Sequence, residues 1–179
     1  MKLHHPPLVR LLQRAYSGEK AAAFAYVGHA GSLRDPEARV AVRQIENDEW
    51  IHRQNILALM RQYDIPVSRW YEVQLHLIGK VISLSCYVIG WFMPMYFAGR
   101  LESGNVNEYL RMEELVVGTA IADEQGCIHQ MALVEKQHEE YFLEQVRVHP
   151  ALPLFQALFG WGLGRSRNPV TTVAPGTVR

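Results

Sequence analysis

Four amphipathic segments, each broken by an ionisable residue near its middle, most constrain what this chain of 179 residues can fold into. Apolar residues recur there at three- and four-residue steps, which predicts helices over about residues 8–28, 35–63, 84–109 and 123–148. A carboxylate is costly to bury without a partner, so a single break would indicate a local defect or a paired charge. Four breaks at matching depth indicate one shared partner.

The spacing of the breaks predicts how the helices are connected. In an antiparallel pair of helices, residues at equal depth are equidistant from the turn. Glu19 and Glu49 are 30 residues apart, and their midpoint falls in the turn-like sequence GSLRDP. Glu102 and Glu135 are 33 apart, with a glycine at the midpoint, whereas the 53 residues from Glu49 to Glu102 exceed a tight hairpin. Strand signals are weak throughout, so we expect an all-α, ferritin-like four-helix bundle with one long crossover between its second and third helices.

Two Glu-x-x-His segments, Glu49-Trp50-Ile51-His52 and Glu135-Lys136-Gln137-His138, give these breaks a chemical meaning. Residues three apart share one helix face, so each segment can offer a carboxylate and an imidazole to the same ion. Two such segments and two lone glutamates form the ligand set of di-iron and di-manganese bundles. The predicted metal ligands are Glu19, Glu49, His52, Glu102, Glu135 and His138.

Charge balance indicates the cofactor and excludes some partners. Two divalent ions cancel the charge of four carboxylates, and the oxygen and nitrogen ligands suit two iron ions, with manganese or zinc left open. Lys plus Arg number 18 and Asp plus Glu number 18, so no net field favours nucleic acid. The two cysteines, Cys86 and Cys127, lie in apolar stretches and suggest reduced thiols in a cytoplasmic protein.

At these residues the chain resembles the ferritin-like superfamily, and within it the demethoxyubiquinone hydroxylase family. The segment Ser17-Gly18-Glu19, followed by small residues and Tyr26, is similar to the first-helix motif of that family. Bacterial ferritin-like proteins annotated with it share motifs like Gly99–Ser103 and Met131–His138, so the resemblance covers about residues 10–148. Ser103 stands where the hydroxylases often carry a second acidic residue, which leaves the substrate open.

The resemblance implies that two ferrous ions reduce dioxygen and that a small, apolar, quinone-like substrate is hydroxylated or oxidised. The partners are then that substrate, dioxygen and an unidentified electron donor. Ferroxidase activity, iron handling, peroxide detoxification and a purely structural metal remain alternatives. A shell-forming oligomer would favour storage.

Two apolar regions lie outside the four stripes. No charge occurs between Val81 and Gly99, and Leu152–Leu163 is apolar and followed by Arg165 and Arg167. We expect one domain over residues 1–149, then an apolar segment and flexible tail over 150–179. The apolar regions fit either attachment to the inner face of a membrane or a buried homodimer face, and both readings stay open.

Several other residues are assigned ordinary packing roles. Leu84, Val88 and Trp91 are expected on the buried stripe that leads to Glu102, as part of the third helix. Gly90 and Pro94 are expected to kink that helix. Packing is also the favoured role for Tyr16, Tyr26, Tyr109 and Trp50, with relay of electrons or protons as the alternative for the three tyrosines near the predicted ligands. No function is assigned to His29, His76 and His129.

Overall fold

The computed structural model describes residues 3–163, and within that range the chain is all-α, without strands. The elements are α1 (Pro6–Ser32), α2 (Pro36–Gln62), α3 (Arg69–Ser85), α4 (Phe92–Val116), η1 (Ala122–Glu124), α5 (Gln125–Val146) and α6 (Leu152–Phe159). The predicted flexible tail, with Arg165 and Arg167, lies outside the described residues.

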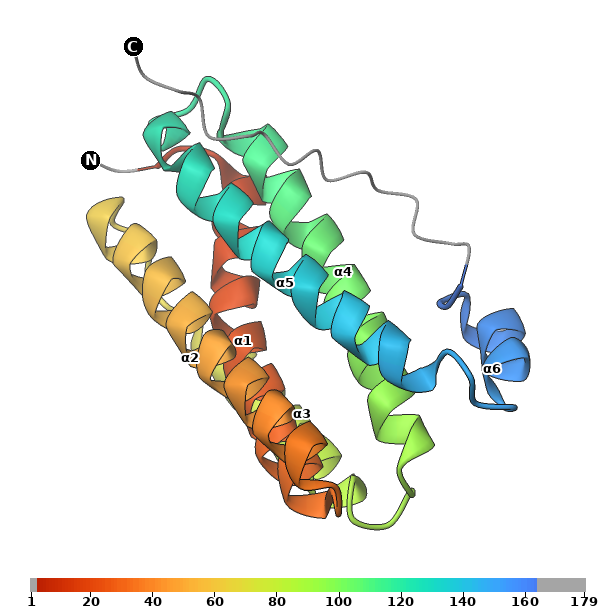
Figure 1. Cartoon of the computed structure of the whole chain (residues 1–179). Coiled ribbons are helices and arrows are strands. Elements are labelled where there is room, and N and C mark those ends of the chain that lie inside the picture. Colours follow the sequence, from red (N-terminus) through yellow and green to blue (C-terminus); the bar gives the residue numbers. More distant parts are fainter. Residues whose placement is uncertain (1–2, 164–179) are drawn as a thin grey trace.

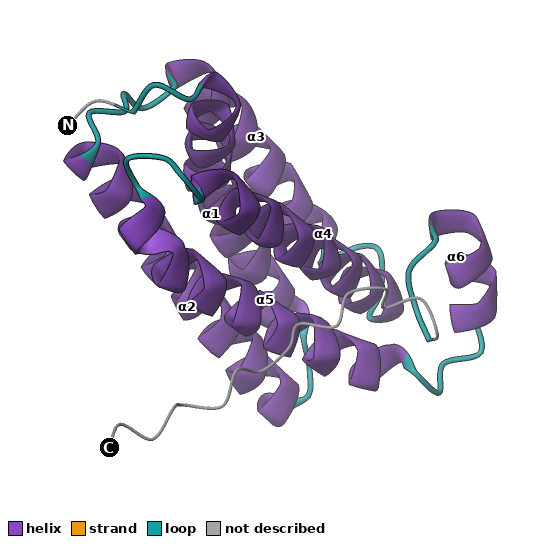
Figure 2. Cartoon of the chain, turned by 90° about the horizontal axis from the view of Figure 1, so that it is seen from above, coloured by secondary structure: helices purple, strands orange, loops and turns teal. Residues whose placement is uncertain are grey.

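The long helices are arranged as two closely packed groups. Helix α1 packs along both α2 and α3, and α4 packs along α5. Figure 1 shows α1, α2, α4 and α5 running lengthwise beside one another, and Figure 2 shows them from above. The two groups meet where α1 approaches α4 and α2 approaches α5. A site between the groups therefore receives side chains from four helices.

The two predicted hairpin turns are present. Asp35 caps α2 by accepting hydrogen bonds from the backbone N–H groups of Glu37 and Ala38, at 3.2 and 3.3 Å. Pro36 follows at the first position of the helix, where its missing N–H costs nothing. Between α4 and α5 the chain turns at Gly118, whose φ is 73°.

The predicted crossover between the second and third long helices is itself largely helical. Helix α3 begins after Ser68, whose hydroxyl accepts a hydrogen bond from the Tyr71 N–H at 3.4 Å. It lies directly against α1, and a Cβ added at Gly79 would overlap the backbone of Ala21. This close approach explains why a glycine stands in the middle of α3.

The predicted path of the third long helix was wrong at its beginning. Leu84 belongs to α3 and is 71% exposed, Val88 lies in the following turn at 82% exposure, and Trp91 is also exposed. Gly90 has a φ of 80°, a left-handed conformation that suits glycine and ends the α3 direction. Helix α4 starts only at Phe92, so Pro94 lies in its first turn and kinks nothing. Apolar periodicity predicted one continuous helix from residue 84, but the chain reverses direction between the end of α3 at Ser85 and the start of α4 at Phe92.

Two apolar clusters form the core, one toward each end of the long helices. The first includes Leu8, Leu12, Ile56, Met112 and Ile128. The second includes Tyr26, Val42, Met95, Phe142 and Leu152. The predicted ligands lie between these clusters along each helix, as expected from stripes that are apolar on both sides of each break.

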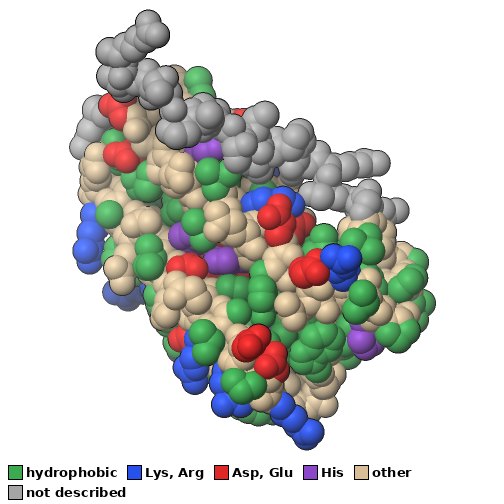
Figure 3. All heavy atoms as spheres, viewed as in Figure 1, with side chains coloured by type: hydrophobic (Ala, Val, Ile, Leu, Met, Phe, Trp, Pro, Cys, Tyr) green, Lys and Arg blue, Asp and Glu red, His purple; other side chains and the backbone are tan. Residues whose placement is uncertain are grey.

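Helix α6 covers one end of the α4–α5 pair. Leu152 and Trp161 are buried, and the Tyr96 hydroxyl lies 2.9 and 2.8 Å from the carbonyl oxygens of Phe155 and Trp161. Leu154 and Leu158 remain exposed, and hydrophobic side chains gather at this end of the face in Figure 3. Among residues 3–163, no helix has both the length and the apolar character that crossing a bilayer requires.

Candidate metal centre

All six predicted ligands converge in the interior between the two helix groups. Their side chains come from α1, α2, α4 and α5, and each is buried. Glu49, Glu102 and Glu135 have no exposed surface at all. Four helices thus place glutamates at one depth, as the spacing predicted. That these residues bind metal stays a prediction.

The six side chains form two overlapping groups of four. Ligand atoms of Glu19, Glu49, His52 and Glu135 all lie within 4.8 Å of one another, and those of Glu49, Glu102, Glu135 and His138 do likewise. A metal bound at about 2.1 Å separates opposite ligands by about 4.2 Å, so small side-chain adjustments suffice for each group to hold one ion. Glu49 and Glu135 belong to both groups, so both ions would share them if two were bound.

His138 has the arrangement of a metal-ligating imidazole. Its Nε2 lies 3.2 Å from Oδ2 of Asp48, so the Asp48 carboxylate accepts the Nε2 proton. That tautomer leaves the Nδ1 lone pair 3.6 Å from Oε1 of Glu49 and 3.9 Å from Oε2 of Glu135. Neither separation is a hydrogen bond, but both are typical of two ligands on one ion.

Unpaired buried atoms provide the test of whether this site fits metal ions. Within the described residues, Oε2 of Glu19, both carboxylate oxygens of Glu49 and Nδ1 of His138 have no hydrogen-bond partner. Buried polar atoms without partners are rare because each forfeits its interaction with water. All four atoms belong to residues of the two groups of four, and their oxygen and nitrogen chemistry suits divalent metals. The residues therefore fit two ions.

Neutral hydrogen-bond donors hold four of the other five carboxylate oxygens, and the fifth, Oε1 of Glu135, lies 2.9 Å from Nδ1 of His52. Tyr26 donates to Glu102, Tyr109 donates to Glu19, and both hydroxyls are buried. The Asn105 amide lies 3.0 Å from Oε2 of Glu102 and 3.3 Å from Oε2 of Glu135, and so links α4 to α5. These groups orient the glutamates without neutralising their charge.

The electrostatics of the centre disfavour ionised carboxylates when metal is absent. Burial, followed by the charges of Glu135, Glu102 and Glu19, raises the pKa of Glu49 well above its usual value. Burial and the charge of Glu135 likewise raise the pKa of Glu102. Burial raises the pKa of Glu135 to about 8. Metal ions reverse this by supplying the missing positive charge.

The nearest arginine on α2 does not supply this charge. Arg53 directly follows His52, but its guanidinium lies 3.0 Å from each carboxylate oxygen of Glu72 on α3 and also donates to the carbonyl of Tyr16. It stacks over the Tyr16 ring, 3.7 Å from the ring centroid. Arg53 therefore fastens α3 to α1 and α2 and does not pair with the central glutamates.

Sequence reasoning missed the two polar residues that support the ligands, Asp48 and Asn105. Neither lies on an apolar stripe. The available signal was position, because each lies within three residues of a predicted ligand. Nδ1 of the unassigned His129 lies 2.9 Å from Oε2 of Glu113, away from the centre.

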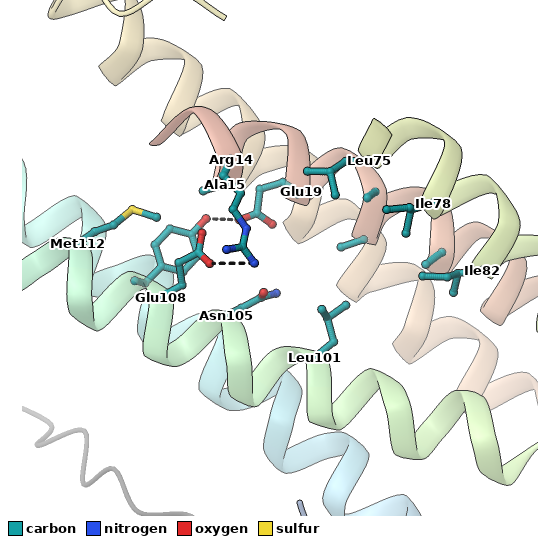
Figure 4. Close-up of a pocket in the computed structure, with 15 residues that line it drawn as sticks. Arg14, Ala15, Glu19, Leu75, Ile78, Ile82, Leu101, Asn105, Glu108 and Met112 are labelled. Atoms are coloured by element: carbon teal, nitrogen blue, oxygen red, sulfur yellow. Dashed lines mark hydrogen bonds and ion pairs between the residues drawn. The ribbon is translucent and has the colours of Figure 1, made fainter. Parts of the chain in front are cut away.

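Cavities reach the centre from two sides. An apolar cavity of about 170 Å³ lies between α1, α3 and α4 and is lined by Glu19, Tyr109 and Asn105. Figure 4 shows Leu75, Ile78 and Ile82 of α3 on its far side. A more open hollow of about 310 Å³ lies between α2 and α5 and is lined by Asp48 and His52. Small molecules thus have two directions of approach.

Comparisons with protein-family models, with curated proteins and with solved structures found no match to this chain. The case for a function therefore rests on the geometry of the six buried side chains and on the cavities beside them.

Proposed function

We propose that this chain is a ferritin-like four-helix bundle that holds two iron ions and uses them in the dioxygen-dependent hydroxylation or oxidation of an apolar, quinone-like substrate. The observation that carries the proposal is the pair of four-residue ligand groups that share Glu49 and Glu135. When bound, a pair of reduced iron ions supplies electrons to dioxygen. Hydroxylation transfers one oxygen atom to the substrate and releases the other as water, and the electron donor provides two electrons.

The side chains around the ligands fit this role. Asp48 holds His138 in the tautomer that presents Nδ1, and outer hydrogen bonds of this kind raise the basicity of a ligand. Tyr26 and Tyr109 hold the two lone glutamates and offer phenol O–H groups beside the reaction space. Burial raises the pKa of both phenols well above the usual value, so both stay protonated at neutral pH.

The apolar cavity beside Glu19 supports a substrate-oxidising role over simple iron handling. Iron entry needs a polar route, whereas most of this cavity is bordered by alanines, leucines and isoleucines of α1, α3 and α4. The charged Arg14 and Glu108 in its wall pair with each other, at 3.9 Å. An apolar passage that ends at a ligand carboxylate suits an apolar organic molecule. The hollow on the α2–α5 side, with Asp48 at its edge, suits ions or an electron donor.

Dioxygen uptake by the iron-loaded protein tests the proposal. Ferrous protein supplied with a chemical reductant and a short-chain quinone is expected to consume dioxygen continuously, well beyond the two iron equivalents. An iron-storage protein would stop once the added ferrous iron was oxidised. Uptake no faster than that of the same concentration of free ferrous iron would overturn the proposed oxygen chemistry.

A further inference from the structure

His29 is a buried histidine that the metal centre does not use. It lies on α1, ten residues after Glu19 and one helical turn after Tyr26, and is 2% exposed. Its ring stacks on Tyr26 and Phe142, with centroid separations of 6.3 and 5.8 Å. Within the described residues, its Nε2 has no hydrogen-bond partner. An unpaired buried nitrogen in such packing indicates that a partner is missing.

His29 lines an apolar cavity of about 360 Å³ between α1, α4 and the turn that follows α3. Ile82, Ile89, Met93 and Phe97 form much of the wall. This volume is large enough for an organic molecule of two fused rings and falls within the range of small-ligand sites.

The other polar side chains that line the cavity already have partners. The Ser85 hydroxyl and the Cys86 thiol both donate to the carbonyl of Ile82, at 2.7 and 3.2 Å. The Tyr26 hydroxyl donates to Glu102. Arg100 is exposed, and its Nε donates to the carbonyl of Phe159 at 3.0 Å. Among the residues that line this cavity, His29 is thus the one with a buried side-chain nitrogen or oxygen, Nε2, that lacks a partner in the described part of the chain.

One unpaired polar atom in an apolar cavity suits an apolar ligand better than water. A buried water needs two to four polar partners, and the side chains here offer one. An apolar ligand with a single oxygen fills the volume and pairs the nitrogen. Burial lowers the pKa of His29 to about 4, so the ring is neutral at physiological pH and offers no charge to an anion.

We propose that this cavity binds the substrate, a neutral apolar molecule whose hydroxyl or carbonyl oxygen is hydrogen-bonded by Nε2 of His29. The proposal rests on the proposed function only in identifying the ligand as the substrate. His29 is then a positioning and specificity residue. It selects neutral oxygen-bearing molecules over hydrocarbons, because a hydrocarbon leaves Nε2 unpaired, and over carboxylates, because the ring carries no charge.

The cavity adjoins the smaller cavity that reaches the metal ligands. It shares Ala25, Ile82 and Leu101 with the smaller cavity that reaches Glu19 and is drawn in Figure 4. Ten residues of helix separate His29 from Glu19, about 15 Å along α1. A ligand held at His29 can therefore extend its apolar body along α1 toward the centre.

Binding of three matched probes tests this assignment without any catalytic turnover. The probes are 2-naphthol, naphthalene and 2-naphthoate, and their affinities are measured by probe fluorescence on the metal-free and the metal-loaded chain. We expect 2-naphthol to bind about tenfold more tightly than naphthalene, as one net hydrogen bond to a buried group provides. We expect 2-naphthoate to bind more weakly than 2-naphthol. Equal affinities for 2-naphthol and naphthalene, or no binding of either, would overturn the proposal.

Substitutions test whether His29 causes the preference for 2-naphthol over naphthalene. His29→Leu is expected to remove the tenfold preference and to keep naphthalene affinity within about threefold, whereas His29→Gln retains a preference because its amide can still hydrogen-bond. His129→Leu is the matched control, since that histidine pairs with Glu113 outside this cavity, and the preference should be unchanged. A preference that survives in His29→Leu would contradict the role of His29.

If His29→Leu fails to fold, the contact between the ligand and His29 can be measured in the wild-type protein by NMR. In ¹⁵N NMR of wild-type protein, 2-naphthol is expected to shift the Nε2 resonance of His29, and naphthalene is expected to leave it nearly unchanged. The same response to both probes would overturn the proposal. Failure of the metal proposal would appear separately, as absent metal binding with the probe preference intact.

Discussion

Two clusters of side chains place carboxylates in opposite electrostatic surroundings. One is the Glu72 cluster, where α3 meets α1 and α2, and the other is the candidate metal centre. Glu72 on α3 receives hydrogen bonds from Arg53, Lys20 and Ser17, with a Lys20 Nζ separation of 3.1 Å and a Ser17 Oγ separation of 2.8 Å. Burial opposes its ionisation, but these donors prevail and lower the pKa of Glu72 to about 2. At the centre, burial and neighbouring glutamates raise the pKa of Glu49 and of Glu102.

The two clusters differ in the source of the positive charge that compensates their carboxylates. The chain provides its own cations where a carboxylate serves to fasten helices together. At the centre it provides four glutamates, two histidines and neutral donors, with no lysine or arginine among their hydrogen-bond partners in residues 3–163. Since buried charge needs compensation, we propose that cations from outside the chain supply it at the centre.

Substitution of a shared ligand should have the largest effect. Glu49→Gln keeps the side-chain shape but removes a charge from both ligand groups. We expect at most one ion to bind per chain, with affinity reduced by more than about 100-fold, because outer-shell changes alone cost 10–100-fold. Isothermal titration with ferrous or manganous ion measures this. Glu72→Gln is the matched control and should still bind two ions.

Substitution of the outer partner of His138 should have a smaller effect on the same quantity. Asp48→Asn keeps the side-chain size but weakens the hold on the Nε2 proton. We expect metal affinity to fall about 10–100-fold while two ions still bind at saturation. A variant with wild-type affinity would show that the 3.2 Å contact does not orient a ligand.

The pH dependence of stability should differ in sign between the two clusters. In metal-free protein, Glu135 has a pKa of about 8 in the folded state, against 4.5 as the ordinary value. The folded state then holds a proton that the unfolded state has released, so stability falls as pH rises from 6.5 to 8. Thermal unfolding in the presence of a chelator should show this slope.

Measuring the same pH dependence in two variants and in metal-loaded protein shows whether Glu135 causes the slope. Glu135→Gln should flatten the slope, and metal loading should remove it or reverse it. Glu72→Gln should leave it unchanged, because Glu72 loses its stabilising charge only between pH 4.5 and about 2. The window starts at pH 6.5 because His29, with its pKa lowered to about 4, destabilises the fold as pH falls below 6.5. Stability that rises with pH throughout this window would contradict the account.

Loss of the Glu72 contacts should affect the stability of the fold and leave metal binding unchanged. Glu72→Gln removes the charge that holds Arg53 and Lys20 beside α3. We expect a loss of about 2 kcal/mol at pH 7, allowing for partial exposure of the pair, and the loss should shrink below pH 4.5. Denaturant unfolding of the metal-loaded protein measures it. A loss that persists undiminished at pH 3 would indicate a packing defect rather than a lost charge.

The sequence predicted the centre better than it predicted the crossover, for a physical reason. Glu49 and His52 interrupt an apolar stripe, and equal spacing about turns fixes the depth of each interruption. Leu84 and Val88 are apolar yet exposed, and periodicity indicates an apolar face without identifying what covers it. The contact between Trp161 and Glu139, at 2.9 Å, joins residues whose pairing no local pattern encodes.

Metal stoichiometry of the wild-type chain tests the central claim most directly. Protein stripped with a chelator is titrated anaerobically with ferrous ion, and bound metal and released protons are measured together. The account predicts saturation at two ions per chain, with net proton release at pH 7 because carboxyl groups with raised pKa values must ionise to bind. Saturation below two ions per chain, or binding of two ions that is unchanged in Glu49→Gln, would contradict it.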